Sequence, residues 1–354
     1  MTRRHRRGYP QRVNPSFSRR LGLATLLSLP LVTTVAACNS SGPGSSPGNE
    51  EVATGGERFG TADEETAKLG SDAEPGVFPR TVVHAKGSTE IAAKPERVVV
   101  LDTGELDAVI TYGITPVGIP STDGATSIPS YLADKVDGIQ SIGTIQELNL
   151  EAIAALEPDL ILGSQLRADA LYDQLSAIAP TVFSIRPGFP WKENFLLAGD
   201  ALGLETEAVA ALNGYADAVA ALKDSVSGDP TISLVRFMPG RIRLYGNLSL
   251  IGVILRDAGL SRPEVEDIEE LAVEISLENL DQADGDILFW TSYGTPESTD
   301  EAAVLEGQVW QNIPAVADDK AFRVDDDTWF LGLGPTGANL IVEQLGEHLA
   351  AVGG

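Results

Sequence analysis

The chain has 354 residues, enough for two domains of ordinary size, and its 43% hydrophobic content is sufficient for buried cores. The formal net charge of −26 excludes nucleic acid as a favoured partner, because phosphate binding needs clustered Lys and Arg. The single Cys excludes an intrachain disulfide, and the three His, far apart in sequence, argue against a histidine-rich metal site. We therefore expect no resident metal or other cofactor.

The first 37 residues are predicted to be an export signal. They hold seven Arg and no Asp or Glu, and residues 21–37 are uncharged. The following Val-Ala-Ala-Cys motif resembles the bacterial lipobox, which implies cleavage before Cys38 and attachment of lipid to its thiol. We thus expect an anchor on the extracytoplasmic face of the cell membrane. A plain signal peptide with an incidental Cys is the alternative, and an Arg-Arg pair before residue 21 leaves the twin-arginine export route open.

Residues 38–76 are rich in Gly, Ser, Pro and Glu and lack hydrophobic periodicity, which predicts a flexible tether. A first lobe is predicted over 77–190, where short apolar runs alternate with helical patterns. The predicted strands are 80–85, 97–101, 117–119, 160–163 and 181–185, and the predicted helices are 104–112, the segment after 149, and 168–178.

A connecting helical segment is predicted over 191–228. Within it, residues 205–226 place apolar side chains at steps of three and four and contain no Pro, which indicates one long helix. Such a helix spans roughly 33 Å at the usual rise per residue. A single stiff connection predicts that the two lobes close only slightly on a ligand.

The second lobe, 229–354, repeats the plan of the first. A strand, a turn and a return strand are followed by alternating helices and strands. The predicted strands are 232–237, 238–244, 287–290 and 321–324, and the predicted helices are 249–258, the segment after 276, 304–312 and 337–351. The alternation predicts an α/β protein of two lobes with mainly parallel sheets, joined by one long α-helix.

One phrase occurs twice, at 149–163 and 276–290, with an offset of 127 and three of fifteen positions identical. Each copy has a capping residue, Leu, Glu, a short helix, Asp and an apolar strand. Glu151 and Glu278 therefore fall in the first turn of equivalent helices, where a carboxylate gains about 0.3–1 kcal/mol from the helix dipole. That local role explains both residues, and the alternative is a shared role as one carboxylate on each lobe.

Candidate ligand contacts follow from the rule that ligands of open α/β sheets bind beyond the carboxyl ends of the strands. Arg residues there supply positive charge and forked donors, and aromatic residues supply stacking area. The alternatives are surface or capping roles for the Arg and core positions for the aromatics. The candidates are Arg167, Arg186, Trp191, Arg236, Tyr245, Tyr293 and Trp329.

Three stretches, 95–119, 143–164 and 313–338, carry a resemblance to a known family when they occur in this order behind a lipobox. Over about 96–354 the chain resembles the iron-siderophore/vitamin B12 class of ABC-transporter substrate-binding lipoproteins. The resemblance implies two Rossmann-like lobes bridged by a helix, the class III periplasmic-binding-protein fold. It further implies that a ligand is captured in the cleft and delivered to a membrane permease, with no chemical step.

The ligand implied by the resemblance is a ferric siderophore, whose anionic and partly hydrophobic surface suits Arg and aromatic contacts. Haem, with Tyr245 or Tyr293 as axial ligand, and cobalamin stay open, and so does the siderophore class. Glu151 and Glu278 resemble the paired Glu residues that dock onto Arg pockets of a twofold permease. We expect a monomer.

Two other classes of function compete with transport. A surface-anchored protein that binds the ligand without transport is compatible with the same sequence. An extracytoplasmic hydrolase is disfavoured, because the chain has no G-x-S-x-G elbow and too few His for a Ser-His-Asp triad.

Overall fold

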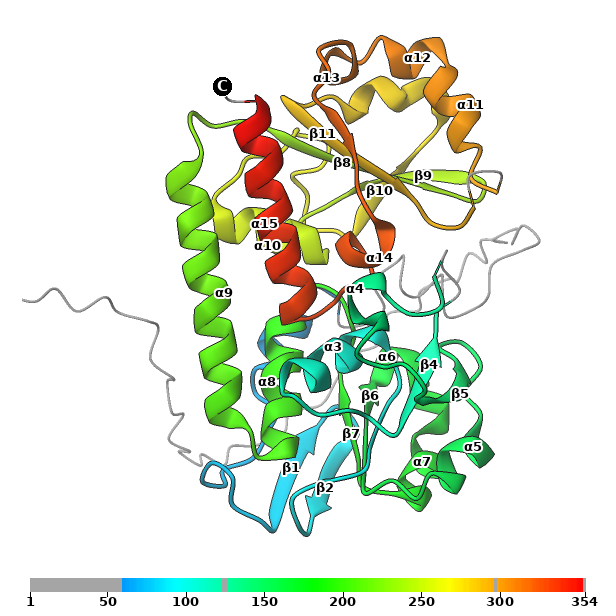
Figure 1. The fold of residues 1–354 in the computed structure, drawn as a ribbon, viewed down its shortest axis with the longest axis vertical. Helices are drawn as coiled ribbons and strands as arrows, with labels where there is room; N and C mark the ends of the chain where they lie inside the picture. Colours follow the sequence, from blue (N-terminus) through cyan, green and yellow to red (C-terminus); the bar gives the residue numbers. More distant parts are fainter. Residues whose placement is uncertain (1–58, 123–125, 296–297, 353–354) are drawn as a thin grey trace, which may run out of the picture. The chain divides into compact units, whose positions relative to one another are not determined.

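The computed structural model describes residues 59–122, 126–295 and 298–352. The predicted signal peptide, Cys38 and the first part of the predicted tether lie outside the described residues. The described part forms two α/β lobes, coloured cyan to green and yellow to orange in Figure 1. None of its helices is long and apolar enough to cross a membrane.

The N-terminal lobe is built on a parallel five-stranded sheet in the order β5-β4-β3-β6-β7. Its strands β3, β6 and β7 are buried along their whole length, as is typical of a parallel sheet covered on both faces. The sheet strands are β3 (Val98–Val100), β4 (Gly118–Ser121), β5 (Gln140–Thr144), β6 (Leu160–Ser164) and β7 (Thr181–Ser184). A hairpin of β1 (Arg80–His84) and β2 (Gly87–Ile91) precedes the sheet.

The predicted helices of this lobe are present, but the short helix Ser130–Ala133 and the strands β2 and β5 were not predicted. The helix predicted at 168–178 is divided into three short pieces, because Ala168 leaves helical geometry with φ −131° and ψ 24°. The helical elements are α3 (Thr103–Thr111), α4 (Ser130–Ala133), α5 (Leu150–Ala155), α6 (Gln165–Ala168), η2 (Asp169–Leu171) and α7 (Tyr172–Ile178).

The C-terminal lobe repeats the strand order of the first lobe as β10-β9-β8-β11-β12. Strands β8, β11 and β12 are parallel, whereas β9 runs antiparallel to both of its neighbours. The reversal follows from a tight turn after β8 that contains Gly240 at φ 72°. The strands are β8 (Ile232–Met238), β9 (Arg241–Tyr245), β10 (Ala272–Ile275), β11 (Ile287–Ser292) and β12 (Ala321–Arg323). The predicted return strand is therefore present.

Helical elements surround this second sheet. They are α10 (Leu250–Ala258), η3 (Leu277–Ala283), α11 (Glu301–Glu306), α12 (Gln308–Gln311), α13 (Pro314–Ala317), α14 (Asp326–Trp329) and α15 (Pro335–Val352). The helix predicted at 304–312 consists of α11 and α12, and the short α14 was not predicted.

Helices α8 (Trp191–Leu202) and α9 (Glu205–Ser225) connect the lobes. Gly203, at φ 69°, ends α8 in the left-handed conformation and lets α9 begin two residues later. The long helix predicted at 205–226 is α9, and it lies beside α15 along much of its length (Figure 1). Its apolar stripe is buried, at Ala208, Tyr215, Val219 and Leu222.

The doubled phrase has the same structural role in both lobes. Asp159, just before β6, accepts hydrogen bonds from the backbone N–H groups of Glu96 and Arg97, both at 2.8 Å. Asp286, just before β11, accepts from the backbone N–H and the hydroxyl of Thr231, at 2.8 and 2.9 Å. Each aspartate therefore fixes the start of the neighbouring central strand, β3 or β8. The repeat marks equivalent sites in two lobes of one topology.

The capping residues of the phrase differ between the lobes. Asn149 caps α5 as predicted, because its side-chain oxygen accepts from the Ala152 N–H at 3.0 Å. The predicted cap at Ser276 is wrong, since its hydroxyl donates to Glu278 at 3.3 Å. The N–H of Asn279, which that cap would have needed, donates to the Ser276 carbonyl at 3.0 Å in a 3₁₀ turn. Exposed Glu151 and Glu278 nevertheless occupy matching first turns.

The structure differs from the predicted flexible tether over residues 59–76. Residues Phe59–Thr61 form η1 and Ala62–Thr66 form α2, with the Phe59 and Ala62 side chains buried. Buried Arg80, which follows this stretch, forms an ion pair with Asp200 at 2.9 Å and so attaches the chain to α8. The polar composition of this stretch concealed the few apolar residues that fix it to the lobe.

A buried carboxylate on the first lobe holds the last helix of the chain. Asp107 of α3 is fully buried and accepts from the backbone N–H groups of Thr336 and Gly337, both at 2.9 Å. It also accepts from the hydroxyls of Tyr131 and Thr111, at 2.8 and 3.1 Å. Because Thr336 and Gly337 begin α15, Asp107 caps a helix of the other lobe and faces the positive end of its dipole. The two lobes are joined here by charge-assisted hydrogen bonds.

We predict that Asp107→Ala lowers the free energy of unfolding by about 3 kcal/mol, because it leaves buried N–H donors without acceptors. Tyr131→Phe, which removes one of the four donors, should cost about 1 kcal/mol. Urea unfolding followed by tryptophan fluorescence measures both. An Asp107→Ala protein as stable as the Tyr131→Phe control would contradict the capping role.

Candidate functional site

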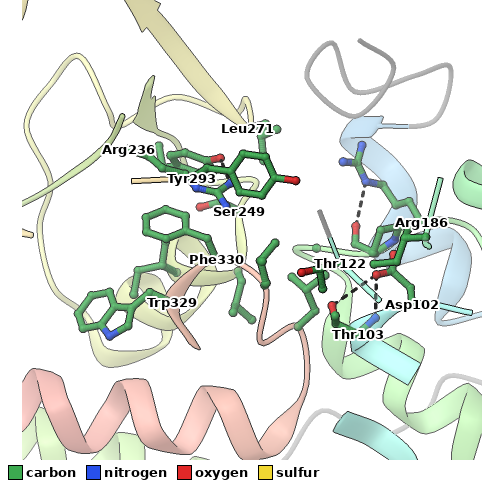
Figure 2. A pocket seen from close by; sticks show the side chains of 18 of the residues that line it. Asp102, Thr103, Thr122, Arg186, Arg236, Ser249, Leu271, Tyr293, Trp329 and Phe330 are labelled. Atoms are coloured by element: carbon green, nitrogen blue, oxygen red, sulfur yellow. Dashed lines mark hydrogen bonds between the residues drawn. The ribbon is translucent and has the colours of Figure 1, made fainter. Parts of the chain in front are cut away.

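A pocket lies where the two lobes face each other, at the carboxyl ends of their parallel strands. Asp102, Arg167 and Arg186 follow β3, β6 and β7, and the end of β8 contributes Arg236. Figure 2 shows Asp102, Thr103 and Arg186 on one side and Arg236, Ser249, Tyr293, Trp329 and Phe330 on the other. The position agrees with the strand-end rule for open α/β sheets.

Six of the seven ligand candidates named from the sequence line this pocket. They are Arg167, Arg186, Arg236, Tyr245, Tyr293 and Trp329. The seventh, Trp191, is not among the lining residues, because its ring packs edge-on against Tyr215, with ring centres 4.9 Å apart, away from the pocket. The first turn of α8 directs this ring into the apolar core. Contact of the six residues with a ligand stays a prediction.

Arg236 is the most tightly held cation of the pocket. Its Nε and Nη2 donate to the two carboxylate oxygens of Asp326, each at 2.6 Å, and Nη1 donates to the Tyr245 hydroxyl at 2.9 Å. Its guanidinium carbon lies 4.7 Å from the Tyr293 ring centre and 4.9 Å from that of Phe330. Burial alone would lower the pKa of Arg236, but Tyr245 and Asp326 raise it above its usual value. The guanidinium is therefore a fixed and permanently charged donor.

Sequence reasoning missed Arg243, which lies directly opposite Arg236 in the ladder of β8 and β9. Both side chains are nearly buried and line the pocket. Like charges in directly opposed positions repel one another. Glu274 offsets the second charge, accepting from Nε and Nη2 of Arg243 at 2.9 and 2.8 Å. The strand-end rule overlooked Arg243 because β9 is antiparallel. The available signal was the spacing of Arg241 and Arg243, which places two Arg side chains on the same face of a strand.

The first lobe contributes two more cations. Asp102 caps α3, accepting from the Thr103 N–H at 2.7 Å, and its other oxygen accepts from Arg167 Nε at 3.0 Å. Burial, and then repulsion from Arg167, lower the pKa of Arg186 to about 9. Arg186 therefore remains a cation at neutral pH.

The charge of the pocket is opposite to that of the whole chain. Among the described residues that line it are four Arg and a single acid, Asp102, although the chain carries a formal net charge of −26. Asp326 and Glu274 pair with two of these Arg and partly neutralise the positive charge. A concave site with this residual positive charge favours an anionic ligand over a neutral one.

Glu105, one turn into α3 from Asp102, lies buried beneath the first-lobe cations. Its Oε2 has no hydrogen-bond partner among the described residues. Burial, and then the neighbouring charge of Asp102, raise the pKa of Glu105 to about 8, with Arg167 acting in the opposite sense. The raised pKa favours the protonated form of the Glu105 carboxyl group, and Asp102 forms the ion pair with Arg167.

The aromatic residues give the second-lobe side of the pocket its apolar surface. Trp329 is fully buried, and its indole N–H donates to Gln344 at 2.5 Å, so its ring forms part of the floor. Phe330 packs edge-on against Tyr245 with ring centres 4.6 Å apart. Over the described ranges no group of three or more His, Cys, Asp or Glu is arranged to hold a metal ion. The site is built to hold a charged molecule with flat or apolar parts.

Comparison with known proteins decides the family. The family model for periplasmic binding proteins matches residues 98–328. This chain belongs to that family. Its two α/β lobes, joined through the long helix α9, are those of the class III fold, which confirms the fold class expected from the sequence.

Relatives in this family share most of their length with the chain. A probable siderophore-binding lipoprotein of Bacillus subtilis is 33% identical, over 75% of this chain and 86% of its own length. An Fe(3+)-citrate-binding protein of the same organism is 31% identical, over 71% and 79% respectively. The crystal structure of Staphylococcus aureus SirA complexed with staphyloferrin B superimposes with a TM-score of 0.69 and 30% identity, covering 76% of this chain and 98% of SirA.

Proposed function

We propose that this protein captures an anionic ferric siderophore outside the cell and delivers it to an ABC importer for iron uptake. The observation that carries the proposal is the set of four guanidinium groups, two from each lobe, around one pocket. The relatives that bind siderophores or ferric citrate support it. The iron arrives within the ligand, so the protein needs no metal ligands of its own and performs no chemical step.

The geometry favours ligands that carry carboxylates. Arg236 holds Asp326 in a forked arrangement, with one nitrogen on each oxygen, whereas Arg243 donates two N–H groups to a single oxygen of Glu274. A guanidinium has five N–H donors, of which these contacts and the Tyr245 hydroxyl use three in Arg236 and two in Arg243, and the remaining donors suit the carboxylate oxygens of a ligand. Neighbouring Tyr293 offers a ring face to the apolar parts of such a ligand. A neutral ferric hydroxamate complex makes less use of these cations.

Titration of tryptophan fluorescence tests the proposal. The panel contains ferric citrate, ferric staphyloferrin B, ferri-bacillibactin, ferrioxamine, haem and cobalamin. We expect a carboxylate complex to bind with a Kd of about 1 µM or lower. Arg243→Ala should weaken that binding about tenfold or more, because a hydrogen bond to a charged group is lost.

Arg241→Ala is the matched control. Arg241 also pairs with Glu274, at 3.4 Å, but it does not line the pocket, so its removal should leave affinity within about twofold. A wild-type protein that binds none of the ferric siderophores would refute the proposal. A Soret band on haem addition, with siderophores excluded, would assign the pocket to haem through Tyr245 or Tyr293.

The same proposal assigns a docking role to Glu151 and Glu278. Both are exposed. Each lies in the first turn of the helical element near the start of the repeated phrase, one on each lobe. A permease with twofold symmetry would present the same basic pocket to each lobe. We propose that the protein docks as a monomer, tethered to the membrane through lipid on Cys38.

We predict that the double variant Glu151→Gln, Glu278→Gln keeps its ligand affinity and loses most ferric-siderophore uptake in cells. The control is Glu207→Gln, Glu306→Gln, which makes the same charge change at exposed positions of α9 and α11. Uptake of radioactive iron as the ferric complex is the measurement. Equal uptake by both double variants would contradict the docking assignment. Uptake unaffected by loss of the whole protein would favour binding without transport.

A further inference from the structure

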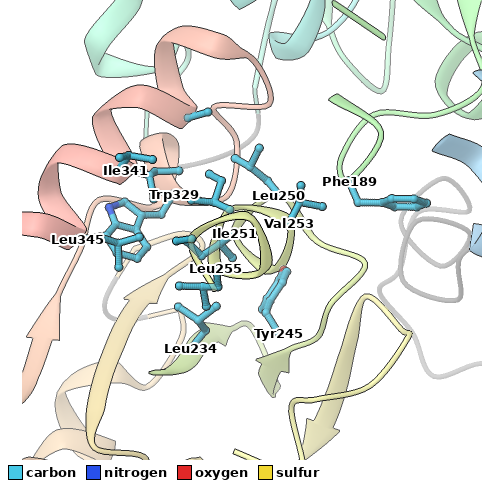
Figure 3. Close-up of a cluster of buried hydrophobic side chains, with 14 of the residues drawn as sticks. Phe189, Leu234, Tyr245, Leu250, Ile251, Val253, Leu255, Trp329, Ile341 and Leu345 are labelled. Atoms are coloured by element: carbon cyan, nitrogen blue, oxygen red, sulfur yellow. The ribbon is translucent and has the colours of Figure 1, made fainter. Parts of the chain in front are cut away.

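The segment that leads from the predicted tether into the first lobe contacts a residue that lines the pocket. Phe59 of η1 and Ala62 of α2 are 8% and 0% exposed, and they belong to one apolar cluster with Phe189 and Trp191. Figure 3 shows Phe189 at the edge of this cluster, whose other labelled side chains come from the second lobe. The segment precedes the 98–328 match to the family model.

Phe59 lies against a cation of the pocket. The guanidinium carbon of Arg186 is 4.2 Å from the centre of the Phe59 ring and 5.7 Å from that of Phe189. The two rings meet edge to face at 5.6 Å and 75°. Figure 2 shows the N-terminal segment, drawn in blue, beside Arg186. One side of the Arg186 guanidinium is thus covered by Phe59 of the N-terminal segment.

The electrostatics of Arg186 explain why an aromatic wall is useful. The residue is 3% exposed and is repelled by Arg167, so both burial and a like charge disfavour its charged form. A ring face stabilises a cation through its quadrupole and leaves the formal charge unchanged. A carboxylate in the same place would cancel the charge that an anionic ligand needs.

We propose that Phe59 is a positioning residue, which holds the Arg186 guanidinium in the pocket for an anionic ligand. This inference rests on the proposed function and adds a residue outside the two lobes to the binding site. The N-terminal segment is then a wall of the pocket as well as a link to the membrane.

The test compares Phe59→Leu and Phe59→Tyr, titrated by fluorescence with ferric staphyloferrin B or, if it binds more tightly, ferric citrate. Phe59→Leu keeps an apolar side chain and removes the ring face, so Kd should rise about threefold to tenfold, in line with a desolvated cation–π contact. Phe59→Tyr keeps the ring face and should stay within about twofold of wild type. Equal weakening by Leu and Tyr would overturn the inference.

A double-mutant cycle with Arg186→Gln separates positioning from a general structural effect. If Phe59 acts through Arg186, the Leu substitution should change Kd less than twofold in the Arg186→Gln background. The same loss in both backgrounds would overturn the proposal. Phe78→Leu is the matched control, because the Phe78 ring lies 4.5 Å from the Arg80 guanidinium, which does not line the pocket, and its affinity should match wild type.

The cycle also keeps the two proposals apart. A wild-type protein that binds neither ferric probe refutes the proposed function. A wild-type protein that binds one of them, with Phe59→Leu binding equally well, refutes the positioning role alone.

Discussion

Mutual repulsion of like charges is the constraint around which the pocket is organised. Arg236 and Arg243 form a cross-strand pair on adjacent strands. Their charges can lie side by side only because each forms an ion pair with a carboxylate, Asp326 or Glu274. Arg167 is held in the same manner by the cap of α3. Each of these carboxylates fixes the orientation of a guanidinium and offsets part of its charge. The anion site that we propose is therefore preorganised, and its donors need little rearrangement when a ligand enters.

Such a receptor also depends on the two lobes being held together, and buried carboxylates do this as well. Asp107 of the first lobe caps α15, and Asp327 of the second lobe accepts from the Ser130 N–H at 2.6 Å. Gly334 permits the first contact, because a Cβ there would lie 2.6 Å from the Asp107 Cβ. Gly334, in the third family-like stretch, is therefore explained by the close approach of one lobe to the other.

The two-lobe α/β plan and the long connecting helix could be predicted because they follow from local patterns: apolar strands, capping residues and a phrase repeated in both lobes. The strand order and the strands β2, β5 and β10 could not be predicted, because their residues show no clear apolar run. Arg236 could be predicted because it ends a parallel strand. Arg243 could not, since its place depends on the reversal of β9, and Trp191 could not, since helix orientation turned it inward. Phe59 was hidden by a polar neighbourhood that carries no periodicity, and its partner Arg186 lies far along the chain. Contacts of this kind arise from tertiary packing, which a single sequence does not encode locally.

The central claim is that one anionic ferric complex binds to Arg side chains of both lobes. A crystal structure of the protein with the bound ferric ligand tests it most directly. The account predicts ligand oxygens within hydrogen-bond distance of Arg236 or Arg243 on one side and of Arg167 or Arg186 on the other. A ligand held by one lobe alone, or bound outside this pocket, would contradict it.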